Sequence, residues 1–281
     1  MKRTKHTSIL ARLLCAVLAA LCVQGAAAEA IDLGTAGNYG AFILGDVTDL
    51  STVGGRLAVG RDLDSAWLDI GLGLRANVGG EVALVVGRDI KRFADGGIWL
   101  NTYGTFARSA AQLKANLDLR KQASRIDFEA ETAWLTMLAA QLQQKSATGS
   151  VMMTGSTVLL QGSQADVEVF QLSAAQVAGG RVLALGNLKP GAYLILNVGS
   201  DTQRTVRLLW NQLALKDYQA RVLFNFPDAE SVQFDLASVW GSMLAPYACL
   251  KSTGGVVQGT VIAASWTGNT EIKYMPFTPK P

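Results

Sequence analysis

The side chains that could carry chemistry in this sequence are mainly aspartates, because the only histidine is His6. His6 lies in a segment that we expect to be removed, so the mature chain has no imidazole for a catalytic triad, a histidine base or a zinc site. The patterns Ser-x-x-Lys, Gly-x-Ser-x-Gly and Gly-Lys-Ser/Thr do not occur either. A carboxylate pair of the glycosidase type is the enzymatic alternative that remains.

The acids available for such a pair lie in short repeated segments, at Asp46, Asp62, Asp64, Asp69 and Asp89. Asp62 and Asp89 both follow Val-Gly-Arg, so they occupy the same place in two copies of a repeat. This equivalence favours a structural role in a turn over calcium binding or catalysis. We therefore predict no catalytic, metal-binding or cofactor-binding residue, and no cofactor.

Two further patterns imitate binding sites. Gly-x-Gly-x-x-Ala at 71–76 matches part of a dinucleotide fingerprint, but Asn77 and Gly79-Gly80 break the helix that should follow. Six tryptophans could stack on sugars, which is weak support for a binding role. Four of them have expected structural positions, in a helix core or at strand ends: Trp134, Trp210, Trp240 and Trp266.

Residues 1–28 are predicted to be a signal peptide. A basic start precedes the apolar run Leu13–Val23, and Ala26-Ala27-Ala28 provides a small-residue cleavage site. Eleven apolar residues are too few to span the ~30 Å hydrocarbon core as a helix. No later segment is long and apolar enough to cross a membrane, so we expect no membrane span after removal of the signal.

Removal of the signal changes the charge and cysteine arguments. The full chain has 25 basic and 22 acidic residues, and the signal carries four of the basic ones, so the mature chain has a net charge of −1. No basic patch with interleaved aromatic residues occurs, and we predict no nucleic-acid partner. Cys249 is the only cysteine left, which excludes an internal disulfide, and we expect it to be a buried thiol.

Short apolar runs rich in β-branched residues predict strands on both sides of a central helical segment. Gly-Gly pairs precede several of these runs, at 54–55, 79–80, 179–180 and 254–255. The first two copies both continue to Val-Gly-Arg-Asp, and this periodicity is typical of a solenoid. The alternative is an ordinary β-sandwich in which the Gly-Gly pairs mark unrelated loops.

The central segment predicts one long helix over Ser124–Lys145, with Ser124 as its N-cap. Its length would be about 33 Å. We expect an apolar stripe of Phe128, Trp134, Leu138 and Leu142 to face the sheet. Thr105–Leu117 also has helical spacing.

Four segments, in this order, resemble the bacterial choice-of-anchor A domain: LGTAGNYGAFILGDV, GGRLAVGRDL, SRIDFEAETAWLTMLAAQL and GSMLAPYACL…GGVVQGTVIAASW. The resemblance covers most of residues 31–277. It implies a secreted or surface-displayed adhesive domain with a β-solenoid fold. Members of that family typically carry a C-terminal anchor, whereas this chain stops at PFTPKP, which leaves the mode of attachment open.

We therefore predict a mainly β protein, a single-domain parallel β-solenoid (an irregular β-helix) over residues 31–277, with one long α-helix packed along its side. The predicted function is that of an exported, non-enzymatic surface or extracellular-matrix protein, an adhesin whose partner is an extracellular surface, glycan or matrix ligand. The expected location is secreted or cell-surface, with the periplasm as the alternative. A carbohydrate-active solenoid enzyme that uses carboxylates is the second hypothesis.

Ice binding is the third hypothesis, because ice-binding solenoids combine strands and a helix in a similar plan. Ice adsorption needs small hydroxyls or methyls repeated from coil to coil. The repeat strands instead read Leu-Ala-Val-Gly-Arg-Asp and Ala-Leu-Val-Val-Gly-Arg-Asp, with charged residues at equivalent places. We therefore predict no ice activity.

Overall fold

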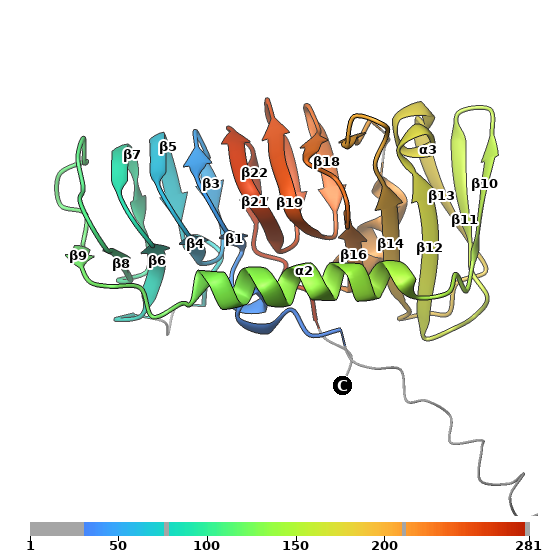
Figure 1. Cartoon of the computed structure of the whole chain (residues 1–281), viewed down its shortest axis with the longest axis horizontal. Coiled ribbons are helices and arrows are strands. Elements are labelled where there is room, and N and C mark those ends of the chain that lie inside the picture. The colour runs from blue at the N-terminus through green and yellow to red at the C-terminus, as the bar shows by residue number, and fades with distance from the viewer. Residues whose placement is uncertain (1–30, 76–78, 210–211, 279–281) are drawn as a thin grey trace, which may run out of the picture. The chain divides into compact units, whose positions relative to one another are not determined.

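The computed structural model describes residues 31–75, 79–209 and 212–278. The predicted signal peptide, residues 1–28, lies outside the described residues. The described chain is a mainly β protein whose strands stack in parallel from coil to coil, so the predicted β-solenoid is confirmed. Figure 1 shows these coils side by side, with one long helix lying along them. None of the helices within the described ranges is long and apolar enough to cross a membrane.

Most coils contribute strands to three faces of one large sheet. The first, which we call the helix-covered face, has the spatial order β9 (Leu119–Lys121), β8 (Tyr103–Phe106), β6 (Val82–Val86), β4 (Leu57–Val59), β1 (Ala41–Ile43), β21 (Val261–Gly268), β19 (Ser242–Ser252), β16 (Val222–Asn225), β14 (Tyr193–Gly199) and β12 (Val167–Ser173).

The second face contains β15 (Thr205–Arg207), β17 (Ser231–Gln233), the later parts of β19 and β21, β2 (Val47–Thr48), and the first parts of β5 (Leu63–Ile70) and β7 (Ile90–Ile98). The third face contains β18 (Ala237–Trp240), β20 (Gly255–Gln258), β22 (Glu271–Lys273), β3 (Thr52–Val53), and the last parts of β5 and β7. A separate sheet consists of β10 (Ser150–Thr154), β11 (Thr157–Gln161) and β13 (Val182–Gly186). The short helical elements are η1 (Gly34–Asn38), α3 (Ala174–Gly179) and η2 (Leu213–Arg221).

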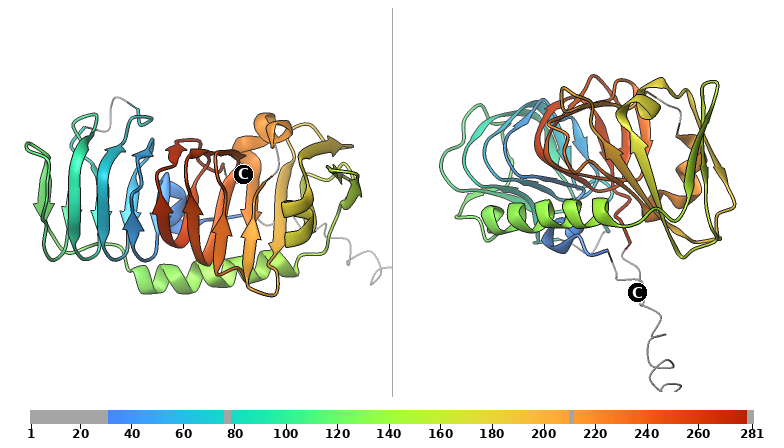
Figure 2. Two further views of the ribbon diagram at one scale, coloured as in Figure 1. Left: turned by 90° about the horizontal axis from the view of Figure 1, so that it is seen from above. Right: turned by 45° about the vertical axis from the view of Figure 1, so that its right-hand side comes forward.

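The spatial order of the coils differs from their order in the sequence. In β1, Ala41 pairs with Leu57 of the next coil on one side and with Val261 of the last coil on the other. The chain therefore starts in the middle, builds coils in one direction as far as β9, and resumes at the opposite end. From there it builds coils back towards β1. Figures 1 and 2 show the result, with the blue N-terminal coil beside the red C-terminal coils. We call this contact between the first and last coils the seam.

The Val-Gly-Arg-Asp repeat has a steric cause at a corner between coils. An ideal Cβ on Gly60 would lie 2.0 Å from the carbonyl oxygen of Leu44, and one on Gly87 would lie 2.3 Å from the carbonyl oxygen of Gly60. Only glycine fits where neighbouring backbones approach this closely. Because Val59 and Val86 also pair in register, the first two copies are true structural repeats.

The later Gly-Gly pairs are not copies of the same unit. The pair at 179–180 precedes β13 in the separate sheet, and in the pair at 254–255 the second glycine is the first residue of β20 on the third face. The helical spacing of Thr105–Leu117 was also misleading. Phe106 ends β8, and Ala110 and Leu113 form isolated bridges with the neighbouring coil instead of a helix.

The long helix is α2 (Phe128–Gln144), which begins later than predicted. Asp127 is its N-cap and accepts hydrogen bonds from the backbone N–H groups of Glu129 and Ala130, whereas the Ser124 hydroxyl is bonded within the preceding turn. Its 17 residues make the helix about 26 Å long. Figures 1 and 2 show it lying across the coils.

The buried face of α2 is rotated from the predicted stripe. Trp134 is 38% exposed, so its predicted place in the helix core is wrong, whereas Leu135 is fully buried. The helix packs with its buried residues Leu135, Leu138, Ala139 and Leu142 against one outward apolar residue from each of several coils. These sheet residues are Ala58, Phe42, Ile262, Leu244, Leu223 and Ile195.

Two buried asparagines fix the C-terminal half of α2 to the sheet. Asn197 and Asn225 pair in register on neighbouring coils. The Asn197 amide donates to the Leu142 carbonyl at 2.8 Å, and the Asn225 amide donates to the Ala139 carbonyl at 2.9 Å. Buried amides that find such partners specify one position of the helix along the coils.

We predict that Leu135→Ala lowers the free energy of unfolding by about 2–5 kcal/mol, because it leaves a cavity under α2. Trp134→Ala should cost clearly less, since that ring is partly in solvent. Urea denaturation of both variants measures the difference. An equal or larger loss for Trp134→Ala would mean that α2 presents another face to the sheet.

Candidate functional site

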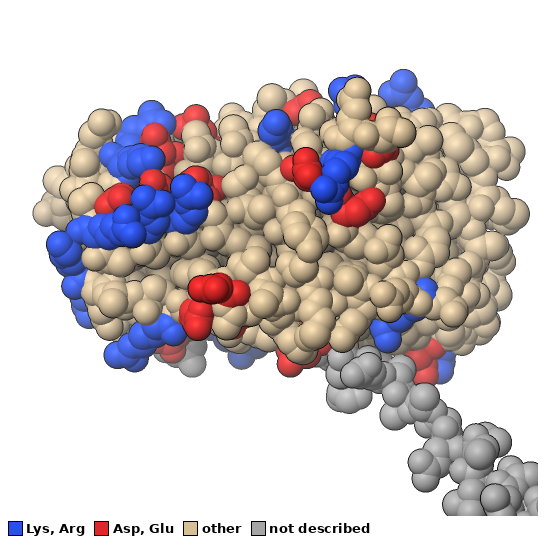
Figure 3. Space-filling view, viewed as in Figure 1, with Lys and Arg blue, Asp and Glu red and all other residues tan. Residues whose placement is uncertain are grey.

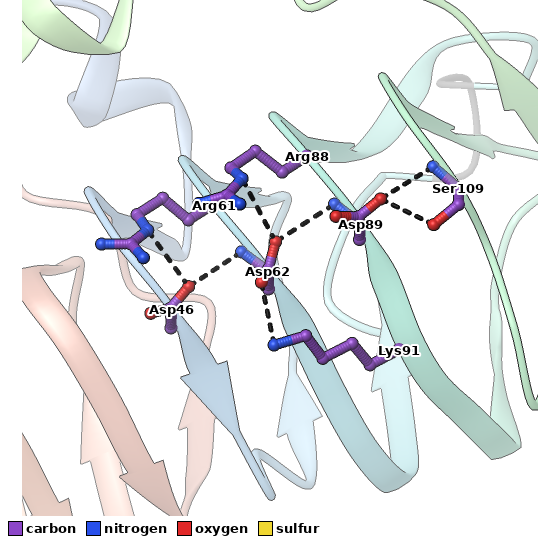
Figure 4. A network of polar contacts seen from close by, with 7 residues as sticks. All are labelled: Asp46, Arg61, Asp62, Arg88, Asp89, Lys91 and Ser109. Carbon is purple, nitrogen blue, oxygen red and sulfur yellow. Dashed lines mark hydrogen bonds and ion pairs between the residues drawn. The ribbon is translucent and has the colours of Figure 1, made fainter.

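The repeated aspartates form a ladder that connects neighbouring coils (Figure 4). The backbone N–H of Asp62 donates to Asp46 Oδ1 at 3.1 Å, and the N–H of Asp89 donates to Asp62 Oδ1 at 3.3 Å. Asp89 Oδ1 accepts from both the N–H and the hydroxyl of Ser109, at 2.9 and 2.6 Å. The predicted structural role of Asp62 and Asp89 is therefore confirmed.

Charged neighbours hold Asp62 in its ionised form. Burial alone would raise the pKa of Asp62, but hydrogen bonds from the Lys91 amine and the Asp89 N–H, together with the charges of Lys91 and Arg88, lower its pKa below the ordinary value of 3.8. The Lys91 amine lies 2.9 Å from Asp62 Oδ2, and Arg88 Nε lies 3.7 Å from Oδ1. A carboxyl held in this way is poorly suited to act as a general acid.

The remaining candidate acids are engaged elsewhere. Asp64 accepts from Arg92 Nε at 2.6 Å on the second face, and Asp69 lies towards the end of β5 on the third face. Within the described ranges, no group of three or more His, Cys, Asp or Glu side chains is placed to hold a metal ion. Gly71 and Gly73 of the dinucleotide-like pattern lie in the turn after β5, and Ala76 lies outside the described residues. Cys249, expected to be buried, is of intermediate exposure in β19.

A shallow groove of about 810 Å³ crosses the seam, and we call it the seam groove. The N-terminal coils supply Asp49, Ser51 and Trp67, and the C-terminal coils supply residues including Gln233, Lys251 and Asn269. The Ser51 hydroxyl donates to the Asn269 carbonyl at 2.8 Å across the seam, although the two residues are 218 positions apart in the sequence. The groove exists because the first and last coils are neighbours.

An aromatic pair stands beside the seam groove. Trp67 is 52% exposed and lines the groove, and Trp99 is 46% exposed and follows the next strand, β7. Both indole N–H groups donate to one carboxylate: Trp67 Nε1 lies 3.0 Å from Asp69 Oδ2, and Trp99 Nε1 lies 2.7 Å from Asp69 Oδ1. Large rings this exposed are unusual, and here one charged acceptor orients both of them. We call these three residues the tryptophan pair site.

Sequence reasoning missed this site. Trp67 and Trp99 were not singled out because they are far apart in the sequence, and nothing local shows that their coils are adjacent. One signal was available: Trp67 and Asp69 are two residues apart, so in a strand their side chains share a face. The register Asp69–Gly97 then places Trp99 beside them.

The outward side of the second face is chemically mixed. Register pairing places one residue from each coil in a row, in the order Arg207, Gln233, Lys251, Thr267, Thr48, Asp64 and Arg92. Most of these side chains are charged. In the view of Figure 3, acidic and basic side chains also intermingle over the N-terminal coils instead of forming a surface of one sign.

We predict that Asp62→Asn costs about 1–3 kcal/mol of stability at pH 7, because a charged acceptor between two coils is lost. The pKa of Asp62 in the folded protein lies below 3.8. The stability that its ionised carboxylate gives to the fold is therefore present above pH 3.8 and is lost as the pH falls through the folded pKa. Urea denaturation at several pH values should show that the variant loses less stability than the wild type below about pH 4. Asp217→Asn, at an exposed position of η2, is the control and should follow the wild type. If the stability of Asp62→Asn depends on pH in the same way as that of the wild type, this role of Asp62 is contradicted.

Two solved structures and one family model are similar to this chain. One structure is an ice-binding protein from the Antarctic ascomycete Antarctomyces psychrotrophicus, at 12% sequence identity and a TM-score of 0.39; the match covers 87% of this chain and 98% of that chain. The other is an ice-binding protein from an Antarctic biological consortium, at 14% sequence identity and a TM-score of 0.38; the match covers 87% of this chain and 89% of that chain. No curated protein matches the chain. A family model described as "Putative Ice-binding-like adhesive domain" matches residues 32–274. The chain therefore belongs to this family of ice-binding-like adhesive domains.

Proposed function

We propose that this protein is exported and acts outside the cytoplasm as a non-enzymatic adhesive domain that attaches to a surface. The observation that carries the proposal is the match of an adhesive-domain family model to residues 32–274, which is nearly the whole described chain. The predicted signal peptide supports export. The sequence resemblance to the choice-of-anchor A domain supports the same role and adds display on a surface or in an extracellular matrix.

The arrangement of the carboxylates favours binding over catalysis. A glycosidase needs one carboxyl whose pKa is raised, so that it can donate a proton. Instead, hydrogen bonds and neighbouring charges outweigh burial and lower the pKa of Asp62, and hydrogen bonds do the same for the pKa of Glu168. The Asp46, Asp62 and Asp89 side chains accept backbone N–H groups, and Asp69 accepts two indoles. The acids of the repeats thus hold the coils and the rings in place.

The ligand of the adhesive domain belongs to an extracellular surface, as a glycan or a matrix component. The seam groove is the best binding surface for it, because it combines polar side chains with an exposed ring. Tryptophan is common among the residues that contribute most to binding, and a ring that is already oriented loses little entropy when a ligand binds.

We expect intact producing cells to display or release the protein. Protease treatment of intact cells, followed by immunoblotting of cells and medium, should find the protein accessible or secreted, and beads coated with it should attach to a surface that blank beads do not bind. The matched control is a variant without residues 2–28, which should stay inside the cell. A wild-type protein found only in the cytoplasm would contradict export, and coated beads that attach to none of the cell-wall or matrix surfaces offered would contradict adhesion.

We also predict that the purified protein neither produces thermal hysteresis nor shapes ice crystals. Ice adsorption needs a flat face of small side chains, and Arg207, Lys251 and Asp64 interrupt the outward row of the second face. Nanolitre osmometry checks this prediction against a buffer blank. Faceted crystals at micromolar protein would show that one of the solenoid faces, and not a groove, is the functional surface.

A further inference from the structure

We propose that the tryptophan pair site and the adjoining seam groove bind a neutral, linear, β-1,4-linked glycan. This inference rests on the proposed adhesive function and names its ligand class and its site. Two features of the described surface carry it: two exposed rings fixed by one carboxylate, and a polar groove that continues from them across the coils.

Two large rings stay in solvent in a fixed orientation. Trp67 and Trp99 leave about half of their surface in water, although indoles are among the side chains that gain most from burial. Their N–H groups are bound to Asp69, so a ligand would meet these rings through apolar contact and not through the indole N–H groups. The Trp99 ring packs over Gly97, at ordinary van der Waals distance from the position that a Cβ would take there.

Pyranose sugars fit this arrangement chemically. A sugar ring with equatorial hydroxyls exposes C–H groups on its two faces, and these groups pack on the electron-rich face of an indole. Each oxygen of Asp69 uses one lone pair for an indole N–H and keeps another for a sugar hydroxyl. The Asp69 carboxylate thus orients both indole rings, and its remaining lone pairs can accept hydrogen bonds from the hydroxyls of a bound sugar.

The groove adds polar contacts at the spacing of the coils. Neighbouring coils are about 4.8 Å apart, close to the length of one sugar unit in an extended chain. Ser51, Gln233 and Asn269 belong to different coils and line the groove with hydroxyl and amide groups. A chain that follows the coils would therefore meet a hydrogen-bonding group at each step.

The charges favour a neutral ligand. Among the residues that line the groove, Asp49 is 2.9 Å from Arg92 Nη2, and Asp235 accepts from the Thr253 hydroxyl at 2.9 Å. Lys251 is the basic residue of the lining. A polyanion would need several basic groups along one line, whereas the groove lining sets Lys251 against Asp49 and Asp235.

Binding to cellohexaose, chitohexaose and soluble glucomannan, measured by titration calorimetry and affinity gels, tests the proposal with the purified protein. We expect at least one of these probes to bind, and polygalacturonate, an anionic chain, to bind more weakly. Trp67→Ala and Trp99→Ala should each weaken binding about tenfold, as expected for the loss of one stacking platform. The double variant should lose binding.

Two further variants distinguish binding at this site from non-specific binding. Trp134→Ala removes a ring of similar exposure on α2 and should leave affinity unchanged. Asp69→Ala keeps both rings but removes the group that orients them, so it should weaken binding while thermal melts show a folded protein. Absence of binding to all three neutral probes, or an equal loss in the Trp134 variant, would overturn the proposal. If beads coated with the Trp67/Trp99 double variant still attach to a surface, the adhesive function stands and the glycan site is wrong.

Discussion

The pairing of β1 with β21 is the contact on which the rest of the architecture depends. It is built from the pairs Ala41–Val261 and Ile43–Ala263, and the seam continues through β2 with β21 and β3 with β22. Closing a loop of this length costs entropy that grows only slowly with the number of residues. Contacts of such high sequence separation form late and slowly in folding. We therefore expect the seam to form after the two groups of coils that it joins.

The seam requires a segment that carries the chain from one end of the coils to the other, and α2 forms the middle of that segment (Figure 1). A helix is suited to the task because it satisfies its own backbone hydrogen bonds while it crosses several strands. Its position is set by the outward apolar residues of the helix-covered face and by Asn197 and Asn225. The same strand residues that pair along the coils thus also provide the surface on which the helix returns.

Local features of the fold were predictable from the sequence, and the spatial order of the coils was not. Short apolar runs such as Leu57–Val59 predicted strands, and the repeated Val-Gly-Arg-Asp predicted coils that stack. Nothing in the sequence near Ala41 indicates that it meets Val261. The helical spacing of Thr105–Leu117 failed because Phe106, Ala110 and Leu117 contact the core from a coil whose backbone bridges to the neighbouring strand at Ala110 and Leu113. The tryptophan pair site was missed because it needs the register of two coils, which the sequence does not show.

The seam also links binding to the closure of the fold. The seam groove takes Asp49, Ser51 and Trp67 from one group of coils and Gln233, Lys251 and Asn269 from the other. A ligand that contacts both groups binds only when the first and last coils are paired, so it stabilises the seam by its own free energy of binding. Parting of the coils there would break the Ser51–Asn269 contact and divide the groove. In an adhesive domain the strand pairing that completes the solenoid would then carry part of the load placed on the ligand.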